Sequence, residues 1–221
     1  MNKKNKIQRI LNSIETGSQD GDYSDISIFE DSPSNQRQIT YGKSQTTEYG
    51  LLKELLEKYI AMGGKYANDF KPYINKIEKV SLVNDNAFKI LLKSAGSDPI
   101  MHSAQDEFFD EFYWEPAVEW AESNGFTQPL SYLVIYDSFI QSGGILGFLR
   151  NRFKERVPSK GGDEKTWITE YVKTRHIWLK THKTRPILHK TVYRTQAMID
   201  AISRADWGLE QPYKVNGDTI Q

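Results

Sequence analysis

The feature that most constrains this chain is a change of hydrophobic period near its start. Ile7, Ile10 and Ile14 recur at helical spacing and predict a helix over residues 3–15. From residue 20 to residue 42 the pattern changes to alternation and turn residues, which predicts a small antiparallel hairpin. Helical periodicity returns afterwards and covers most of the remaining sequence. The fold class is therefore α+β, predominantly α-helical, with one small antiparallel sheet at about 22–45.

The other predicted helices extend to the end of the chain. One begins near Leu51 and stops at Gly63-Gly64, and the rest cover 85–95, 99–113, 116–124, 129–141, 163–182 and 187–204. With 221 residues, the chain is long enough for one domain, 1–221, with two lobes. The segment 159–163 is the best candidate for a connection between those lobes.

The charge balance limits the partners of this protein. Lysine and arginine number 29, and aspartate and glutamate also number 29. We therefore expect no global attraction to nucleic acid or to an anionic membrane. The four histidines show no metal-ligand spacing, so no metal is predicted. We expect a monomer.

The chain has no cysteine, which excludes disulfides and thiolate chemistry. The first six residues carry positive charge, but an amphipathic stretch follows them, so we predict no signal peptide in this chain. No run reaches the ~18 apolar residues that span a bilayer, and no membrane association is expected. An extracellular substrate would place the protein in the periplasm or outside the cell, and a cytoplasmic location stays open.

Two acids in the first third of the chain are the candidate catalytic pair. Glu15 ends the first helix and Asp31 opens a turn, while Thr40 follows on the next strand. Glycoside hydrolysis needs one protonated carboxyl group and one ionised carboxylate. The helix C-terminus and partial burial both favour a protonated Glu15. Asp31 in its polar turn stays ionised and activates a water that the Thr40 hydroxyl holds.

Spacing alone also fits a simpler interpretation. Glu15 is then a solvated carboxylate at a helix end, and Asp31 is a turn initiator. Acidic residues on the helices at 99–113 and 116–124 offer a cleft lining for a cationic polymer, but a solvated helix face is the commoner meaning of such a run.

Several short motifs in one order resemble the family 46 glycoside hydrolases, the chitosanases, and more distantly the phage-type lysozymes. These motifs are Leu11-Asn12-Ser13-Ile14-Glu15, Ile28-Phe29-Glu30-Asp31, Ile39-Thr40-Tyr41-Gly42, Phe112-Tyr113-Trp114-Glu115-Pro116-Ala117-Val118, Ile135-Tyr136-Asp137-Ser138, Gly161-Gly162-Asp163-Glu164 and Asp206-Trp207-Gly208-Leu209. The resemblance implies a lysozyme-like two-lobed fold with the substrate cleft between the lobes. It also implies endo-acting, inverting hydrolysis of β-1,4 linkages in chitosan or a related aminosugar polysaccharide, without a cofactor.

The resemblance further implies that a buried aspartate and arginines behind the catalytic acid orient it. Asp137 and Arg175 match these positions, and Arg194 or Arg185 matches the second arginine. Substrate binding is assigned to three neighbours of the catalytic motifs, which are Glu30, Tyr41 and Glu48.

Two departures from the family pattern bear on the substrate and the base. The chitosanase aspartate that reads the sugar ammonium aligns near Gly50-Leu51, and Glu48 is the closest acid here. The longer hairpin makes Glu30 the neighbour to test as an alternative base to Asp31. A muramidase-like peptidoglycan hydrolase and a catalytically silent carbohydrate-binding module are the alternative functions.

Overall fold

The computed structural model describes residues 3–30, 36–43 and 45–221. The chain divides into two compact units, with residues 1–19 and 111–221 in unit 1 and residues 20–110 in unit 2. The chain therefore passes between the units at residues 19–20 and again at residues 110–111. The prediction that segment 159–163 connects two lobes is wrong, because this segment lies inside unit 1 and carries a short 3-10 helix, η2 (Pro158–Lys160).

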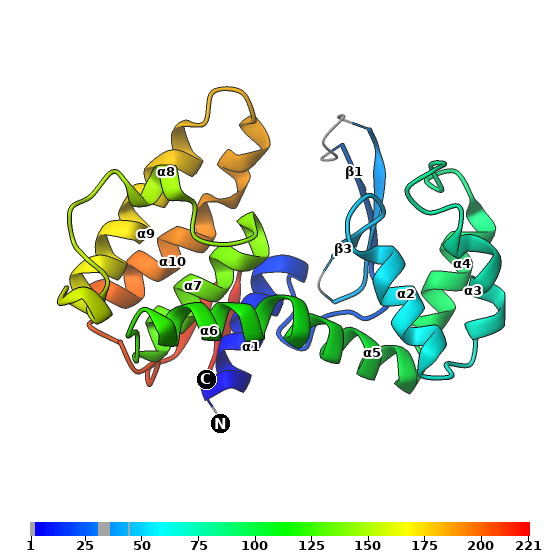
Figure 1. Ribbon diagram of the computed structural model, residues 1–221, viewed down its shortest axis with the longest axis horizontal. Coiled ribbons are helices and arrows are strands. Elements are labelled where there is room, and N and C mark those ends of the chain that lie inside the picture. Colours follow the sequence, from blue (N-terminus) through cyan, green and yellow to red (C-terminus); the bar gives the residue numbers. More distant parts are fainter. Residues whose placement is uncertain (1–2, 31–35, 44) are drawn as a thin grey trace. The chain divides into compact units, whose positions relative to one another are not determined.

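Unit 2 contains the predicted sheet near the N-terminus. Strands β1 (Ile26–Phe29) and β2 (Gln38–Tyr41) pair antiparallel with Ser27 opposite Thr40, which confirms the predicted hairpin. A short third strand, β3 (Thr46–Thr47), pairs with β2, and the order is β1-β2-β3 (Figure 1). The predominantly helical α+β class is confirmed, because the other elements of unit 2 are helices.

The helices of unit 2 enclose its core. They are α2 (Leu52–Ala61), α3 (Ala67–Ile74), α4 (Asn86–Ala95) and α5 (Pro99–Phe109). Asp85 and Asp98 cap α4 and α5 by accepting backbone N–H groups in their first turns. The sequence did not predict α3, where Pro72 interrupts the pattern and Phe70 is the only side chain buried on that helix.

Unit 1 is built around α1 (Lys3–Thr16) and α7 (Pro129–Ser142). The π-helix η1 (Asp110–Trp114) carries the chain from unit 2 into unit 1. The other elements are α6 (Glu115–Ser123), α8 (Gly147–Arg150), α9 (Glu164–Thr181), the 3-10 helix η3 (Pro186–Thr191), α10 (Val192–Ser203), β4 (Tyr213–Val215) and β5 (Asp218–Ile220). The predicted helices of this region are confirmed, and the start of the last predicted helix is the separate η3.

The C-terminal hairpin of β4 and β5 fixes the end of α1. Asn216 and Gly217 form its two-residue turn with φ values of 50° and 86°, the left-handed region that a type I′ turn requires. The Asn216 side-chain amide donates to the carbonyl of Ser13 over 3.0 Å. Residues at the two ends of the chain therefore hold the last turn of α1 together.

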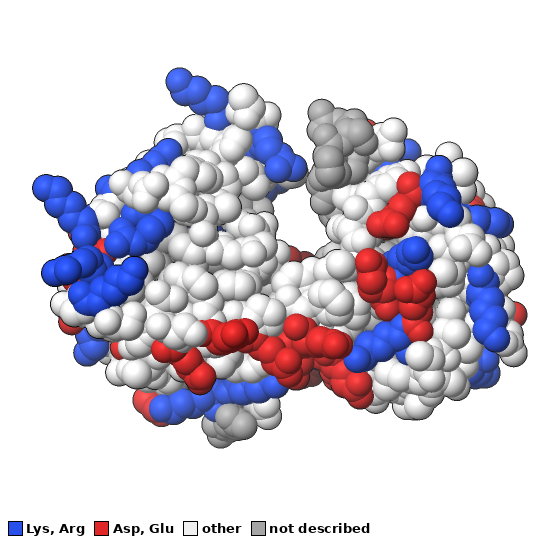
Figure 2. Space-filling view, viewed as in Figure 1, with Lys and Arg blue, Asp and Glu red and all other residues white. Residues whose placement is uncertain are grey.

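Charged side chains are unevenly distributed over the surface. Figure 2 shows acidic side chains gathered along α6, and lysine and arginine side chains over the part of unit 1 that carries α8 and α9. In unit 2, Asp106 pairs with Lys43 at 2.7 Å and Glu107 with Lys58 at 3.4 Å. Of the helices in the described residues, none is long and apolar enough to cross a membrane.

Candidate active site

Glu15 lies in the last turn of α1, the place that the sequence predicted. The helix ends because Gly17 takes a left-handed conformation with φ of 71°, and no basic residue occupies the last turn. The Tyr193 hydroxyl donates to the carbonyl of Ile14 over 2.6 Å, which ties this turn to α10. The Glu15 side chain keeps 21% of its surface exposed. The Glu15 carboxyl group is therefore partly accessible to solvent.

The Glu15 side chain contacts the first of three buried charged residues that are linked to one another. Arg194 of α10 donates through Nη2 to Glu15 Oε1 and through Nε to Asp137 Oδ1 over 2.9 Å. Asp137 of α7 is fully buried and also accepts from Nη1 of Arg175 on α9. Four helices thus contribute one charged residue each. The structure brings together the predicted residues Glu15, Asp137, Arg175 and Arg194.

In this arrangement the guanidinium groups of Arg175 and Arg194 face the carboxyl groups of Asp137 and Glu15. Burial acts to raise the pKa of Asp137, but Arg175 and Arg194 outweigh it and hold that pKa below its ordinary value. Burial likewise acts to lower the pKa of Arg194, and the charges of Asp137 and Glu15 more than offset it and raise that pKa. Both groups are therefore ionised, and Arg194 is fixed from two sides.

Gln141 extends the chain of contacts by one residue that the sequence did not predict. Its Oε1 accepts from Nη2 of Arg175, and its Nε2 donates to the Thr191 hydroxyl over 3.1 Å. Gln141 follows Asp137 by four residues on α7, so both side chains lie on the same face of that helix. The spacing of one helical turn after Asp137 is the sequence feature from which Gln141 could have been predicted as a second hydrogen-bond partner of Arg175.

Two tyrosines lie within electrostatic range of Glu15. Burial raises the pKa of Tyr113, and the charge of Glu15 adds to that increase. Burial also raises the pKa of Tyr193, with Arg194 opposing and Glu15 reinforcing the effect. Glu15 therefore has a partly aromatic environment.

Thr40 lies on β2 in unit 2 and is buried. Its hydroxyl lies 2.8 Å from Gln45 Oε1 and 3.2 Å from the carbonyl of Ser27, so it can donate to one of the two. Gln45 sits at a positive φ of 52° and donates through Nε2 to Asp25 over 2.8 Å. The sequence did not predict Gln45 and Asp25, which fix the acceptor beside Thr40.

The other predicted site residues of unit 2 have different surroundings. Glu30 is exposed, and Asp31 lies outside the described residues. Tyr41 is fully buried and donates to the carbonyl of Leu92 over 2.8 Å. Glu48 is also fully buried, and its oxygens accept the backbone N–H groups of Leu82 at 2.6 Å and Ile39 at 3.1 Å. Their burial argues against the predicted contact of Tyr41 and Glu48 with a substrate.

Predominantly helical architecture, a small sheet near the N-terminus and a partly exposed carboxyl group held by a buried arginine agree with the glycoside hydrolase class that the sequence predicted. The profile of glycosyl hydrolase family 46 matches residues 9–213, which is most of the sequence. The chain belongs to this family.

Known proteins of similar sequence and structure agree with this assignment. A chitosanase from Bacillus subtilis (strain 168) is 23% identical over 231 residues, covering 97% of this chain and 82% of the relative. The fold matches a mutant Bacillus subtilis chitosanase complexed with 6 GlcN, with a TM-score of 0.84, 22% identity and coverage of 99% and 98% of the two chains. A Gynuella sunshinyii chitosanase in complex with chitotetraose gives a TM-score of 0.84, 21% identity and coverage of 98% and 96%.

Proposed function

We propose that the protein is an endo-acting, inverting hydrolase of β-1,4 linkages in chitosan or a related aminosugar polysaccharide. The observation that carries this proposal is the geometry of Glu15, which is partly exposed while Arg194 and Asp137 hold it from behind. The relatives named as chitosanases, and the two structures with bound sugar oligomers, support chitosan as the polymer. A polymer of this kind places the site of action in the periplasm or outside the cell.

Glu15 is the proposed general acid. Arg194 contacts Oε1, so Oε2 is the oxygen that delivers a proton to the leaving glycosidic oxygen. Asp137 fixes the position of Arg194, and Arg175 in turn fixes the position of Asp137. Arg194 therefore orients the Glu15 carboxyl group. These three residues act as positioning residues.

Asp31 is the proposed general base, and Thr40 orients the water that it activates. Because the Thr40 proton is donated to Gln45 or Ser27, its oxygen keeps lone pairs that accept from a water. An inverting reaction needs that water between base and sugar, with carboxyl groups roughly 6.5–9.5 Å apart. Glu30 is the exposed neighbour to compare as base and as a substrate contact.

The proposal is tested by incubating the protein with soluble chitosan from pH 4 to 8 and separating the products by chromatography. Release of short oligomers is expected, and Glu15→Gln should abolish it. Glu57→Gln, on the exposed side of α2, is the matched control and should keep full activity. Absence of oligomers across the whole pH range would reject chitosan as the substrate.

The base and the stereochemistry are tested separately. Asp31→Asn should abolish turnover, and proton NMR of fresh product should show the inverted anomer. If Glu30→Gln abolishes turnover while Asp31→Asn keeps it, the base is Glu30. Retention of configuration would reject the inverting mechanism.

Peptidoglycan is the second candidate substrate, and the burial of Glu48 favours it. A carboxylate that is fully buried and accepts two backbone N–H groups offers no contact to a sugar ammonium, so one expected element of glucosamine recognition is missing. Clearing of a cell-wall suspension without action on chitosan would favour this candidate. Oligosaccharide binding without any turnover would instead indicate a silent binding module.

A further inference from the structure

A pocket of about 260 Å³ opens in unit 1 between the ends of α7 and α9, with α8 and η3 completing its walls. The residues that line it belong to unit 1 and do not include Glu15, Asp137 or Arg194. A cavity of this size holds one sugar ring with a substituent. Ligand sites of this kind combine aromatic walls with a few polar groups, and both features are present here.

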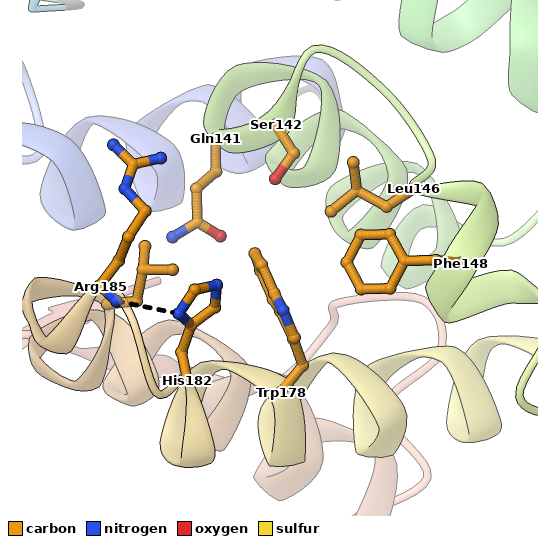
Figure 3. A pocket seen from close by; sticks show the side chains of 8 residues that line it. Gln141, Ser142, Leu146, Phe148, Trp178, His182 and Arg185 are labelled. Atoms are coloured by element: carbon orange, nitrogen blue, oxygen red, sulfur yellow. Dashed lines mark hydrogen bonds between the residues drawn. The ribbon is translucent and has the colours of Figure 1, made fainter. Parts of the chain in front are cut away.

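The apolar part of the pocket is an aromatic cluster centred on Trp178. Figure 3 shows its indole between Phe148 and His182. The centroid of the Trp178 ring lies 5.6 Å from Phe148 at 66° and 5.2 Å from His182 at 74°, so both neighbours are edge-on. Phe148 keeps 48% of its surface exposed although it is large and apolar. Because both neighbours turn their edges toward the indole, the cluster offers a sugar ring an apolar wall rather than an open stacking face.

The polar groups around this aromatic cluster are mainly hydrogen-bond donors. His182 Nδ1 accepts the backbone N–H of Arg185 over 3.1 Å, so the proton of a neutral ring sits on Nε2 (Figure 3). The Arg185 guanidinium contains only donors. The Ser142 hydroxyl points into the pocket from the opposite wall.

Both polar atoms of Gln141 already have partners outside the pocket lining. Its carbonyl oxygen is committed to Arg175, and its amide nitrogen already donates to Thr191. The residues that the structure places around the pocket include no carboxylate. A ligand that presents oxygen acceptors therefore fits the pocket better than one that presents N–H donors.

The surrounding chain has the same bias. The two segments that contain the lining residues, 141–148 and 178–188, have no aspartate or glutamate. Their basic residues are Lys180, Lys183 and Arg185. Figure 2 shows lysine and arginine gathered over this part of unit 1. The local potential opposes a cation and favours an anion or a neutral acceptor.

We propose that this pocket binds a single sugar unit through an acyl oxygen, which is either the acetamide carbonyl of an N-acetylated aminosugar or the carboxylate of an acidic sugar. The aromatic cluster of Trp178 and Phe148 packs against the ring, and Arg185 with His182 Nε2 donates to the acyl oxygen. A free glucosamine unit is discriminated against, because its ammonium has three donors and no acceptor and carries the same charge as Arg185. This site does not depend on the proposed hydrolysis, since binding is measurable without turnover.

The test is an NMR titration of the full chain, which follows the indole N–H resonance of Trp178 and assigns it with Trp178→Phe. The probes are methyl β-glycosides of N-acetylglucosamine, glucuronic acid and glucosamine, which contain no bond between sugars and are not substrates of an endo-hydrolase. We expect a saturable shift with at least one acyl probe, with an affinity at least about tenfold above that for the glucosamine probe. Saturation by only one of the two acyl probes identifies the acetamide or the carboxylate as the bound group.

Two variants locate the site. Arg185→Ala should lower the affinity for the preferred probe by about tenfold, because it removes a charged hydrogen-bond donor. Lys180→Ala removes an equal charge from an exposed position on α9, the helix of Trp178, outside the pocket, and should leave the affinity unchanged. Equal affinity for amine and acyl probes would overturn the proposal. So would a Trp178 resonance that no acyl probe shifts, or an Arg185→Ala variant that binds like the unmodified chain.

Discussion

Replacement of Asp137 by asparagine tests the buried charge network, since this one carboxylate balances two arginines. The Asp137 side chain is fully buried, and Arg194 contacts it through Nε at 2.9 Å and through Nη2 at 2.8 Å, while Arg175 contacts its other oxygen. Each ion pair at about 4 Å between charge centres contributes roughly 4 kcal/mol at an effective dielectric constant of 20. Desolvation of the charges cancels several kcal/mol of that total.

Asp137→Asn leaves two guanidinium groups with one carboxylate, so we expect the free energy of unfolding to fall by about 3–5 kcal/mol at pH 7. Urea denaturation measures this loss. Asp200→Asn is the matched control on exposed α10 surface, and it should change stability by less than about 0.5 kcal/mol.

The pH dependence of this loss has a definite sign. The folded-state pKa of Asp137 lies below the ordinary value of 3.8, so its stabilising contribution is present above that value and is lost as pH falls through the folded pKa. The stability difference between the unmodified chain and Asp137→Asn should therefore be largest above about pH 4 and shrink on acidification. A difference under about 1 kcal/mol at pH 7, or one that does not change with pH, would refute the account of a balanced network.

Three further predictions concern the catalytic groups, a buried carboxylate and a turn. Glu15→Gln and Asp31→Asn should each lower kcat by ~10²–10⁴-fold, and Thr40→Ala should lower it less, as steady-state assays on chitosan would show. Glu48→Gln should cost about 1–3 kcal/mol in urea denaturation, because a neutral amide replaces a carboxylate that accepts two buried N–H groups, whereas an unchanged midpoint would show that the bonds do not matter. Gly217→Ala should cost about 1 kcal/mol, since a side chain is strained at φ of 86°, and thermal unfolding beside the exposed control Lys214→Ala would reveal it.

The proposed hydrolysis and the proposed sugar pocket are tested independently, through Glu15 and through Trp178. Loss of hydrolysis in Glu15→Gln concerns the catalytic acid, whereas the shift of the Trp178 resonance concerns the pocket beside α9. If an acyl sugar binds there while soluble chitosan is not cut, the pocket is supported and chitosan is rejected as the substrate. If chitosan is cut without that binding, the reverse holds.

Local sequence determined most of the secondary structure and the place of the catalytic candidate. The apolar spacing of α1 and the glycine that follows it put Glu15 at a helix end, because periodicity and turn chemistry are encoded within a few neighbouring residues. The Asn216-Gly217 pair carries the same kind of signal for the C-terminal hairpin, although we did not predict that hairpin. Where the local signal was weak, as at Pro72 in α3, the helix was missed.

The partners of each polar side chain were decided by the tertiary structure. From the sequence, Arg194 and Arg185 were alternatives for the second arginine that orients Glu15. In the structure Arg194 contacts Glu15, from which it is 179 residues away in sequence, while Arg185 lines the pocket near Trp178. Glu48 was assigned to substrate binding because of its neighbours in sequence. In the structure it is buried and accepts the strand N–H of Ile39 and the loop N–H of Leu82. A carboxylate has the same sequence signature whether it meets solvent, an arginine or a backbone amide. Only the packing of distant elements sets which of these surrounds it, and with that its charge and its role.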